Sequence, residues 1–282
     1  MNASKKEFAR AVERVAAQFP NMRVLSHLSA ALKDLNSELH EIVPVVQGDP
    51  LLAAEIIRIS NSTIYRGEEP CRSVMDALAR IGFGEVMRIV GTVLARDACC
   101  QRLVAYGAPA DEFWAESLTV STLMEALARR RGLDSANAAT IGILHALGRL
   151  VIDSLLVDRD LCVCHDPSIE IITWERTLVG FDYALAGAQV MKRWNFPVDL
   201  IYDIAYHLDP RRAPKPRLML ELLHYSVRLA PELGPNFSAT SYSLPDPTTL
   251  HLRQPLSERY VRAAVEDARG TFERFHRTLH AA

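Results

Sequence analysis

Apolar residues recur at intervals of three and four positions through most of the chain, with polar residues between them. This spacing is typical of α-helices that bury one face. No segment alternates apolar and polar residues convincingly with a period of two, so strands are expected to be few or absent. The pattern predicts an all-α protein in which one helix follows another.

The first predicted helix has clear signals at both ends. In the stretch SKKE, Ser4 can cap a backbone N–H three residues on and Glu7 can reach back, which is a capping box. Pro20 ends the helix. A later start is predicted at Asp49, as N-cap, followed by Pro50 at the first helical position. The apolar face of the first helix consists of Phe8, Val12, Val15 and Phe19.

Similar signals divide the rest of the chain. Ser73 with Asp76 predicts a helix that Gly82 stops. A second Asp-Pro pair, Asp166 and Pro167, predicts another start. The remaining helices are expected at about 25–35, from 37 with a kink or stop at Pro44, from 84, at 111–131, through GILHALGRLVID at 142–153, between Asp182 and Pro197, and at 198–207, 215–229 and 256–280.

Composition changes along the chain suggest where its parts begin and end. Glycine, proline and acidic residues gather around Pro109, which predicts a hinge between two lobes. Proline, serine and threonine are frequent from 234 to 255, which predicts a loop or linker. The expected organisation is an N-terminal amphipathic helix (1–23), an N-terminal helical lobe (24–108), a second helical lobe (109–232), a linker (233–255) and a C-terminal amphipathic helix (256–282).

The last helix carries an apolar stripe on an otherwise charged sequence. That stripe needs a partner, either the protein's own lobes or another chain, and a homo-oligomer formed through this helix is one alternative. The stripe consists of Tyr260, Val261, Val265, Ala268, Phe272, Phe275 and Leu279.

Charge and composition narrow the classes of partner. The formal net charge is −2, so no overall field favours nucleic acid or an acidic membrane, and neither is expected as a partner. The N-terminus lacks the apolar core of a secretory signal, which favours a cytoplasmic protein. The cysteines are odd in number and scattered, so they are expected to be reduced thiols that fill core space: Cys71, Cys99, Cys100, Cys162 and Cys164.

Several stretches, in order, resemble the HDOD family of bacterial signalling domains, which are related to the HD and HD-GYP phosphohydrolases. They are GDPLLAAEIIRISNSTIYRG, CRSVMDALARIGFGEVMRIV, FWAESL, GILHALGRLVI, GAQVMKRWNFP and IAYHLDP. The resemblance covers about 24–232 and rests on the ordered set rather than on one motif. It implies an all-helical fold with an N-terminal helical lobe and a lobe built on the HD arrangement.

The resemblance also implies where metal ligands would lie. HD hydrolases hold one or two divalent ions with an early histidine, an adjacent His-Asp pair and a later aspartate. The early histidine corresponds to Glu116, the pair to His145 and Ala146, and the late aspartate to Val227. Only one of these four ligands is present, so no metal, cofactor or catalytic residue is expected.

The additional histidines of HD-GYP proteins would lie near Tyr183 and His207, and Tyr183 is a further departure. His145 is expected to be a neutral core imidazole with one nitrogen bonded to a nearby acceptor, because nothing is seen to stabilise its charged form. A remnant polar pocket for a small ligand is the alternative. Glu116 is expected to be solvated or locally paired. Gly142 and Gly148 are expected to allow close helix packing.

Three functions remain open. The leading hypothesis is a non-catalytic regulatory module that engages another signalling protein through the groove between lobes or an apolar patch near the C-terminal helix. The second is a phosphohydrolase with a metal site rearranged around Glu116, His145 and His207. The third is a sensor of a nucleotide second messenger in the inherited cleft. The chain contains no GxxxxGK[ST] loop, Gly-x-Ser-x-Gly elbow or His-Glu-x-x-His helix, which excludes several common enzyme classes.

Overall fold

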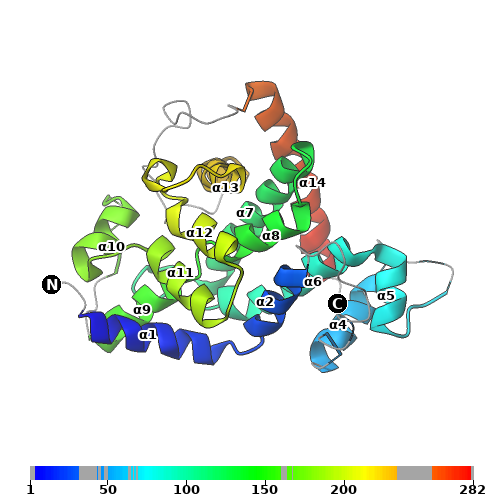
Figure 1. The fold of residues 1–282 in the computed structure, drawn as a ribbon, viewed down its shortest axis with the longest axis horizontal. Helices are drawn as coiled ribbons and strands as arrows, with labels where there is room; N and C mark the ends of the chain where they lie inside the picture. The colour runs from blue at the N-terminus through cyan, green and yellow to red at the C-terminus, as the bar shows by residue number, and fades with distance from the viewer. Residues whose placement is uncertain are drawn as a thin grey trace.

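The structure is a computed structural model that describes residues 4–31, 43, 46–47, 50–62, 65, 67, 69–159, 164–166, 168–233 and 256–280, with backbone alone at 31, 50, 51, 232, 258 and 272–280 (Figure 1). Its elements are α1 Lys5–Gln18, α2 Met22–Ala31, α4 Pro50–Ser60, α5 Val74–Ile81, α6 Phe83–Cys99, α7 Ala110–Arg130, α8 Ser135–Leu144, α9 Gly148–Asp158, α10 Ile171–Val179, α11 Tyr183–Arg193, α12 Val198–Tyr206, η1 Pro210–Arg212, α13 Leu218–Leu229, η2 Ala230–Glu232 and α14 Glu258–His280. Within these residues there is no strand, only an isolated bridge between Leu103 and Ala108. The predicted all-α fold is confirmed.

Helix α1 is closed at its N-terminus by the predicted capping box. The Glu7 N–H donates to Ser4 Oγ at 3.2 Å, and the Ser4 N–H donates to the Glu7 carboxylate at 2.7 Å. The helix lies along α9 and α11 (Figure 1). There the indole Nε1 of Trp194 donates to the Ala16 carbonyl at 3.0 Å. The N-terminal helix therefore packs on the part of the chain predicted to form the second lobe.

Helices α2, α4 and α5 pack on α6, which also contacts α7 and α8. Helix α5 has the predicted capping box at Ser73 and Asp76 and ends at Gly82, whose φ is +81°. Helix α4 begins at Pro50 as predicted, whereas Asp49 and most of the helix expected from 37 lie outside the described residues. The division into lobes at 24–108 and 109–232 stays a prediction.

Helix α7 runs through the interior, in contact with α8, α13 and α14. From Glu116 to Ala128 all of its side chains are buried. A helix that is surrounded in this way has no solvent-facing stripe along its middle turns, so any charged residue there must find a partner inside the protein.

The stretch GILHALGRLVID is two helices rather than the expected one. Helix α8 ends at Leu144 and α9 begins at Gly148, with a turn between them. In the turn the backbone bonds tighten to i→i−3, because the Leu147 N–H donates to the Leu144 carbonyl and the Arg149 N–H to that of Ala146. The tighter turn places His145 at a junction between helices.

The predicted helix start at Asp166 and Pro167 is wrong. Helix α10 begins at Ile171, and its N-cap is Glu170, whose carboxylate accepts from the Thr173 N–H at 2.7 Å. The Asp166 carboxylate instead accepts from the Ser168 N–H at 2.9 Å. Aspartate forms such local turns as readily as helix caps, so the Asp-Pro pair does not distinguish between them.

The cysteines partly follow the expectation. Those that the structure describes are all free thiols, with Cys71 and Cys99 buried. Cys164 differs, because it is exposed in the loop between α9 and α10 rather than part of the core. Cys162 lies outside the described residues.

One described stretch, Ser135–Asp158, is long and apolar enough to cross a membrane by length and composition alone. It comprises α8 and α9 with the turn between them, and 83% of its most apolar window is buried inside the protein. This stretch belongs to the hydrophobic core.

Two glycines bring helices into backbone contact, as expected from the sequence. A Cβ at Gly142 would lie 2.7 Å from the Ser121 Cα of α7, and a Cβ at Gly148 would lie 1.9 Å from the Tyr183 carbonyl oxygen of α11. Real Cβ atoms do not approach backbone atoms so closely. Helix α9 can therefore begin beside α11 only with glycine at 148.

The Gly148→Ala substitution should destabilise the protein by at least about 3 kcal/mol, because the added methyl group meets backbone that cannot rotate away. Gly270 in α14 offers a matched control, since a Cβ there meets nothing within 4 Å. Gly270→Ala should stabilise by up to about 1 kcal/mol through helix propensity. Chemical denaturation of both variants checks this, and equal effects would contradict the close packing.

Helix α14 packs along α7 (Figure 1). Of its predicted apolar stripe, Ala268 is buried, whereas Tyr260, Val261 and Val265 are half-buried. The Tyr260 hydroxyl donates to a carbonyl of α7 at 2.6 Å, and Arg130 pairs with Asp267 at 2.7 Å. Ala264 and Ala268 are fully buried. Packing of this helix on the protein's own body is confirmed, and self-association through it stays a prediction.

Candidate functional site

Glu116 of α7 and Arg149 of α9 form an ion pair inside the protein. Arg149 Nη1 lies 2.5 Å from Glu116 Oε2, and Nη2 lies 3.0 Å from Oε1, so both carboxylate oxygens are bound. The two residues are only 4% and 2% exposed. Such a bidentate pair fixes both side chains. It also balances the two charges in an interior where water does not solvate them.

The expectation that Glu116 would be solvated or locally paired is wrong. Its partner stands 33 residues along the chain and reaches it from another helix. Sequence reasoning missed Arg149, although it is the one charged residue in the apolar run from 141 to 152. An isolated cation in such a run is a signal of a buried partner, because arginine is rarely buried without one.

His145 is fully buried beside this pair. Its Nδ1 lies 2.7 Å from the Gly142 carbonyl oxygen, which only accepts, so Nδ1 carries a proton. Its Nε2 has no hydrogen-bond partner and lies 3.8 Å from Glu116 Oε1. The predicted bond from one ring nitrogen to a nearby acceptor is confirmed. The Glu116 carboxylate lies near this ring, but Arg149 already binds both of its oxygens.

Tyr183 and His207 complete the cluster. The Tyr183 hydroxyl lies 3.0 Å from His207 Nε2, and His207 Nδ1 donates to the Ile204 carbonyl at 2.7 Å. Burial lowers the pKa of His207 well below its ordinary value, and the nearby His145 lowers it further. The neutral ring therefore accepts the tyrosine proton at Nε2. Its centroid is 5.9 Å from that of His145.

Ala146 and Val227 lie in the hydrophobic core and are fully buried. Neither side chain has an atom that could bind a metal. The structure thus brings Glu116, His145, Tyr183 and His207 together and leaves the two positions implied for aspartates apolar.

The residues as arranged do not fit the metal centre that the resemblance implies. In the part of the chain that the structure describes, no group of three His, Cys, Asp or Glu side chains is placed to hold an ion. The decisive feature is Arg149, whose guanidinium binds both oxygens of Glu116, the one carboxylate in the cluster. A cation already fixed at that carboxylate repels a second one.

Comparison with known proteins gives the chain its family. The profile of the HDOD domain matches residues 18–210. The chain belongs to the HDOD family. The resemblance seen in the sequence is confirmed, but the matched region begins earlier than expected, at the end of α1, and ends at 210 rather than at about 232.

Solved structures share this fold. An HDOD domain protein of unknown function from Geobacter sulfurreducens is 20% identical, with a TM-score of 0.62 over 92% of this chain and 88% of its own. A proposed phosphohydrolase from Shewanella amazonensis is 21% identical, with a TM-score of 0.63 over 95% of each chain. A proposed signal transduction protein from Marinobacter aquaeolei is 23% identical, with a TM-score of 0.60 over 94% of this chain and 56% of its own.

An uncharacterised protein from Treponema pallidum is 21% identical over 196 residues. The match covers 68% of this chain but 37% of that longer protein. All these identities are low, so the similarity shows the HDOD fold and leaves the activity of this chain to be argued from its own residues.

A second buried carboxyl group lies beside the ion pair of this HDOD chain. Glu175 accepts from the Tyr106 hydroxyl and from the Tyr183 N–H, both at 2.8 Å. Burial raises its pKa to about 8, although Arg149 acts in the opposite direction. Burial also raises the pKa of Glu116, but Arg149 and His145 together outweigh burial there, and the net pKa is lowered. The carboxyl group that is bonded to Arg149 is thus the one that ionises at the lower pH.

This arrangement predicts a pH-dependent stability. Between roughly pH 5 and 8 the folded protein keeps a proton on Glu175 that the unfolded chain releases near the ordinary pKa of 4.5. The free energy of unfolding should therefore fall as pH rises through this range, by at most about 1.4 kcal/mol per pH unit from this group.

Glu175→Gln should reduce that slope, since glutamine has no proton to lose. Urea denaturation at several pH values measures it, with Glu112→Gln, at a partly exposed position of α7, as the control. A slope in Glu175→Gln equal to that of the unsubstituted protein would show that Glu175 is already ionised in the folded state.

Proposed function

We propose that this HDOD chain is a non-catalytic regulatory module, a pseudoenzyme of the cytoplasm that acts by binding another signalling protein. The observation that carries the proposal is the bidentate bond between Arg149 and Glu116, which occupies the carboxylate that a metal would need. The apolar side chains at 146 and 227 support it, since hydrolysis of a phosphoester by a metal requires anionic ligands there. The Marinobacter aquaeolei relative, a proposed signal transduction protein, agrees with it.

The alternative is a metal-dependent phosphohydrolase, which the proposed function of the Shewanella amazonensis relative and the closeness of His145 to Glu116 favour. Hydrolysis of p-nitrophenyl phosphate and of cyclic dinucleotides, with manganese, iron or zinc present, separates the two functions. We expect no turnover above that of the His145→Ala variant. Turnover that this substitution abolishes would refute the non-catalytic role.

Calorimetry with the same cyclic dinucleotides tests the third function, a sensor of a nucleotide second messenger. Heat of binding would support that function.

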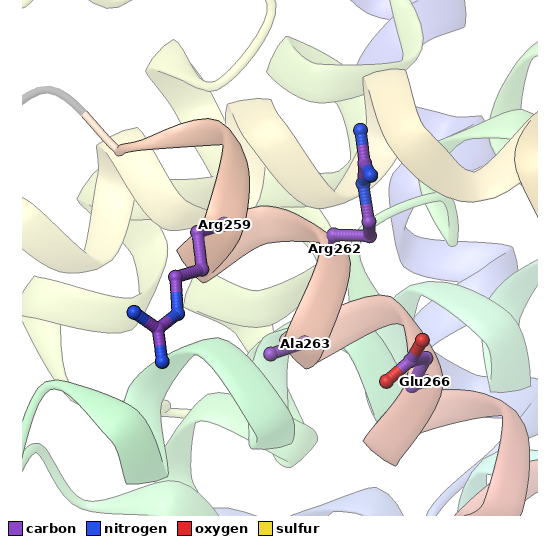
Figure 2. Close-up of a pocket in the computed structure, with 4 residues that line it drawn as sticks. All are labelled: Arg259, Arg262, Ala263 and Glu266. Atoms are coloured by element: carbon purple, nitrogen blue, oxygen red, sulfur yellow. The ribbon is translucent and has the colours of Figure 1, made fainter.

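For the partner surface, α7 already contacts the face of α14 that carries the apolar stripe and leaves Tyr260, Val261 and Val265 half-buried, so the charged side chains of this helix are the more accessible ones. Other side chains of α14 are exposed and charged. Arg259, Arg262, Ala263 and Glu266 line a hollow of about 350 Å³, with the two arginine side chains extending in different directions (Figure 2). Charged, accessible side chains beside a hollow suit a polar, transient interface with a partner that carries carboxylates.

Affinity capture from the native cell tests this surface. Arg259→Glu combined with Arg262→Glu should reduce capture of the partner at least tenfold, while Arg269→Glu, an exposed position on the same helix, should not. Light scattering of the purified protein shows whether the partner is a second copy of the chain. Equal capture by both charge-reversed proteins would move the interface away from α14.

A further inference from the structure

Helix α12 presents an apolar face to solvent. Its buried side chains are Leu200, Asp203 and Ile204, which share one side of the helix. A surface helix normally places charged residues on the opposite side, and a helix that is apolar on every side is normally buried. Here the opposite side is accessible and carries no charge. It consists of Val198, Ile201, Tyr202, Ala205 and Tyr206, all of them half-buried or exposed.

Three of these side chains form a continuous stripe, because Val198, Tyr202 and Tyr206 follow one another at intervals of four residues. Val198 is 78% exposed, more than any other large apolar side chain that the structure describes. The ring centroids of the two tyrosines are 4.9 Å apart. Accessible aromatic side chains beside an exposed aliphatic one are typical of the central part of a protein interface.

The loop that follows the helix is fixed beside this stripe. The Tyr202 hydroxyl accepts from the Lys215 N–H at 2.7 Å and donates to the Lys215 carbonyl at 2.8 Å. Arg217 binds both carboxylate oxygens of Asp203, at 2.7 and 3.2 Å. Prolines stand on both sides of Lys215 and restrict the backbone further. A loop held in this way loses little conformational entropy when a partner binds.

The same loop supplies positive charge. Arg211 is paired with Asp209 at 2.7 Å. Arg212 and Lys215 are exposed, and neither has an ion-pair partner among the residues that the structure describes. Two available cations beside an apolar stripe suit a partner with carboxylates beside apolar side chains. Nucleic acid fits less well, because its affinity depends on many phosphate contacts and the chain as a whole has a net charge of −2.

We propose that the outer face of α12, with Arg212 and Lys215 at its edge, is a second interaction surface that binds an acidic amphipathic helix of another protein. A helix is the fitting partner because α12 offers rows of side chains for helix packing and no free strand edge. This surface is separate from the arginines of α14, so it does not depend on the partner proposed for them.

A synthetic peptide tests the surface with purified protein. The probe is a fluorescent amphipathic helix of about five turns, with leucine and phenylalanine on one face and glutamate beside them. Its counterpart has lysine in place of every glutamate. Fluorescence anisotropy should show that the glutamate peptide binds at least about tenfold more tightly at low salt. The difference should shrink at about 0.5 M salt, where exposed charges are screened.

Matched valines test the apolar stripe. Val198→Ser should weaken binding of the glutamate peptide by about fivefold, because it removes accessible apolar surface without disturbing the core. Val157→Ser is the control, since Val157 is also exposed, at 50%, but lies on α9. It should leave the binding unchanged.

Matched charge reversals test the rim. Arg212→Glu combined with Lys215→Glu should abolish the preference for the glutamate peptide, whereas Arg259→Glu combined with Arg262→Glu on α14 should preserve it. The proposal is overturned if the glutamate peptide binds no more tightly than the lysine peptide, or if Val198→Ser and the reversal at 212 and 215 leave its binding unchanged. Tighter binding of a single-stranded oligonucleotide at the same residues would also overturn it.

Discussion

The Arg149 guanidinium is the charge on which the interior of this protein depends. Taking a carboxylate and a guanidinium out of water costs several kcal/mol per ion, and their bidentate contact offsets this only while both partners are present. Glu175 lies in the same interior with no cation of its own, and it keeps its proton to a pH far above the ordinary range. Of these two buried carboxyl groups, the one bonded to Arg149 has the lowered pKa and the other has the raised pKa.

The close packing of the α9 backbone on α11 determines where that charge lies. The absence of a side chain at Gly148 lets α9 begin against the Tyr183 carbonyl of α11, and Arg149 is the next residue. The guanidinium carbon lies 4.8 Å from the centre of the Tyr183 ring, within range of a cation–π contact. The same tyrosine donates to His207. The contact between α9 and α11, the Arg149–Glu116 ion pair and the orientation of the His207 ring therefore depend on one another. A change in one of them should alter the other two.

Much of the fold could be predicted from the sequence, because helix ends are local. The capping boxes at Ser4 and Ser73 are each set by residues three positions apart, and both are present. Asp166 shows the limit of such reasoning, since the same side chain caps a turn as well as a helix. The family motifs also marked four residues of the cluster, Glu116, His145, Tyr183 and His207, but not Arg149.

The chemistry of the cluster could not be predicted in this way. The state of Glu116 depends on a side chain 33 residues away, which reaches it only after α8 and α9 have turned at residues 145–147. No local pattern shows that contact, although a lone arginine in an apolar run hints at it. A double-mutant cycle in metal-free buffer tests most directly whether this pair governs the interior. Glu116→Gln and Arg149→Met should each cost about 3–5 kcal/mol of unfolding free energy and far less together, a coupling of about 3 kcal/mol or more. Costs that simply add would contradict the account.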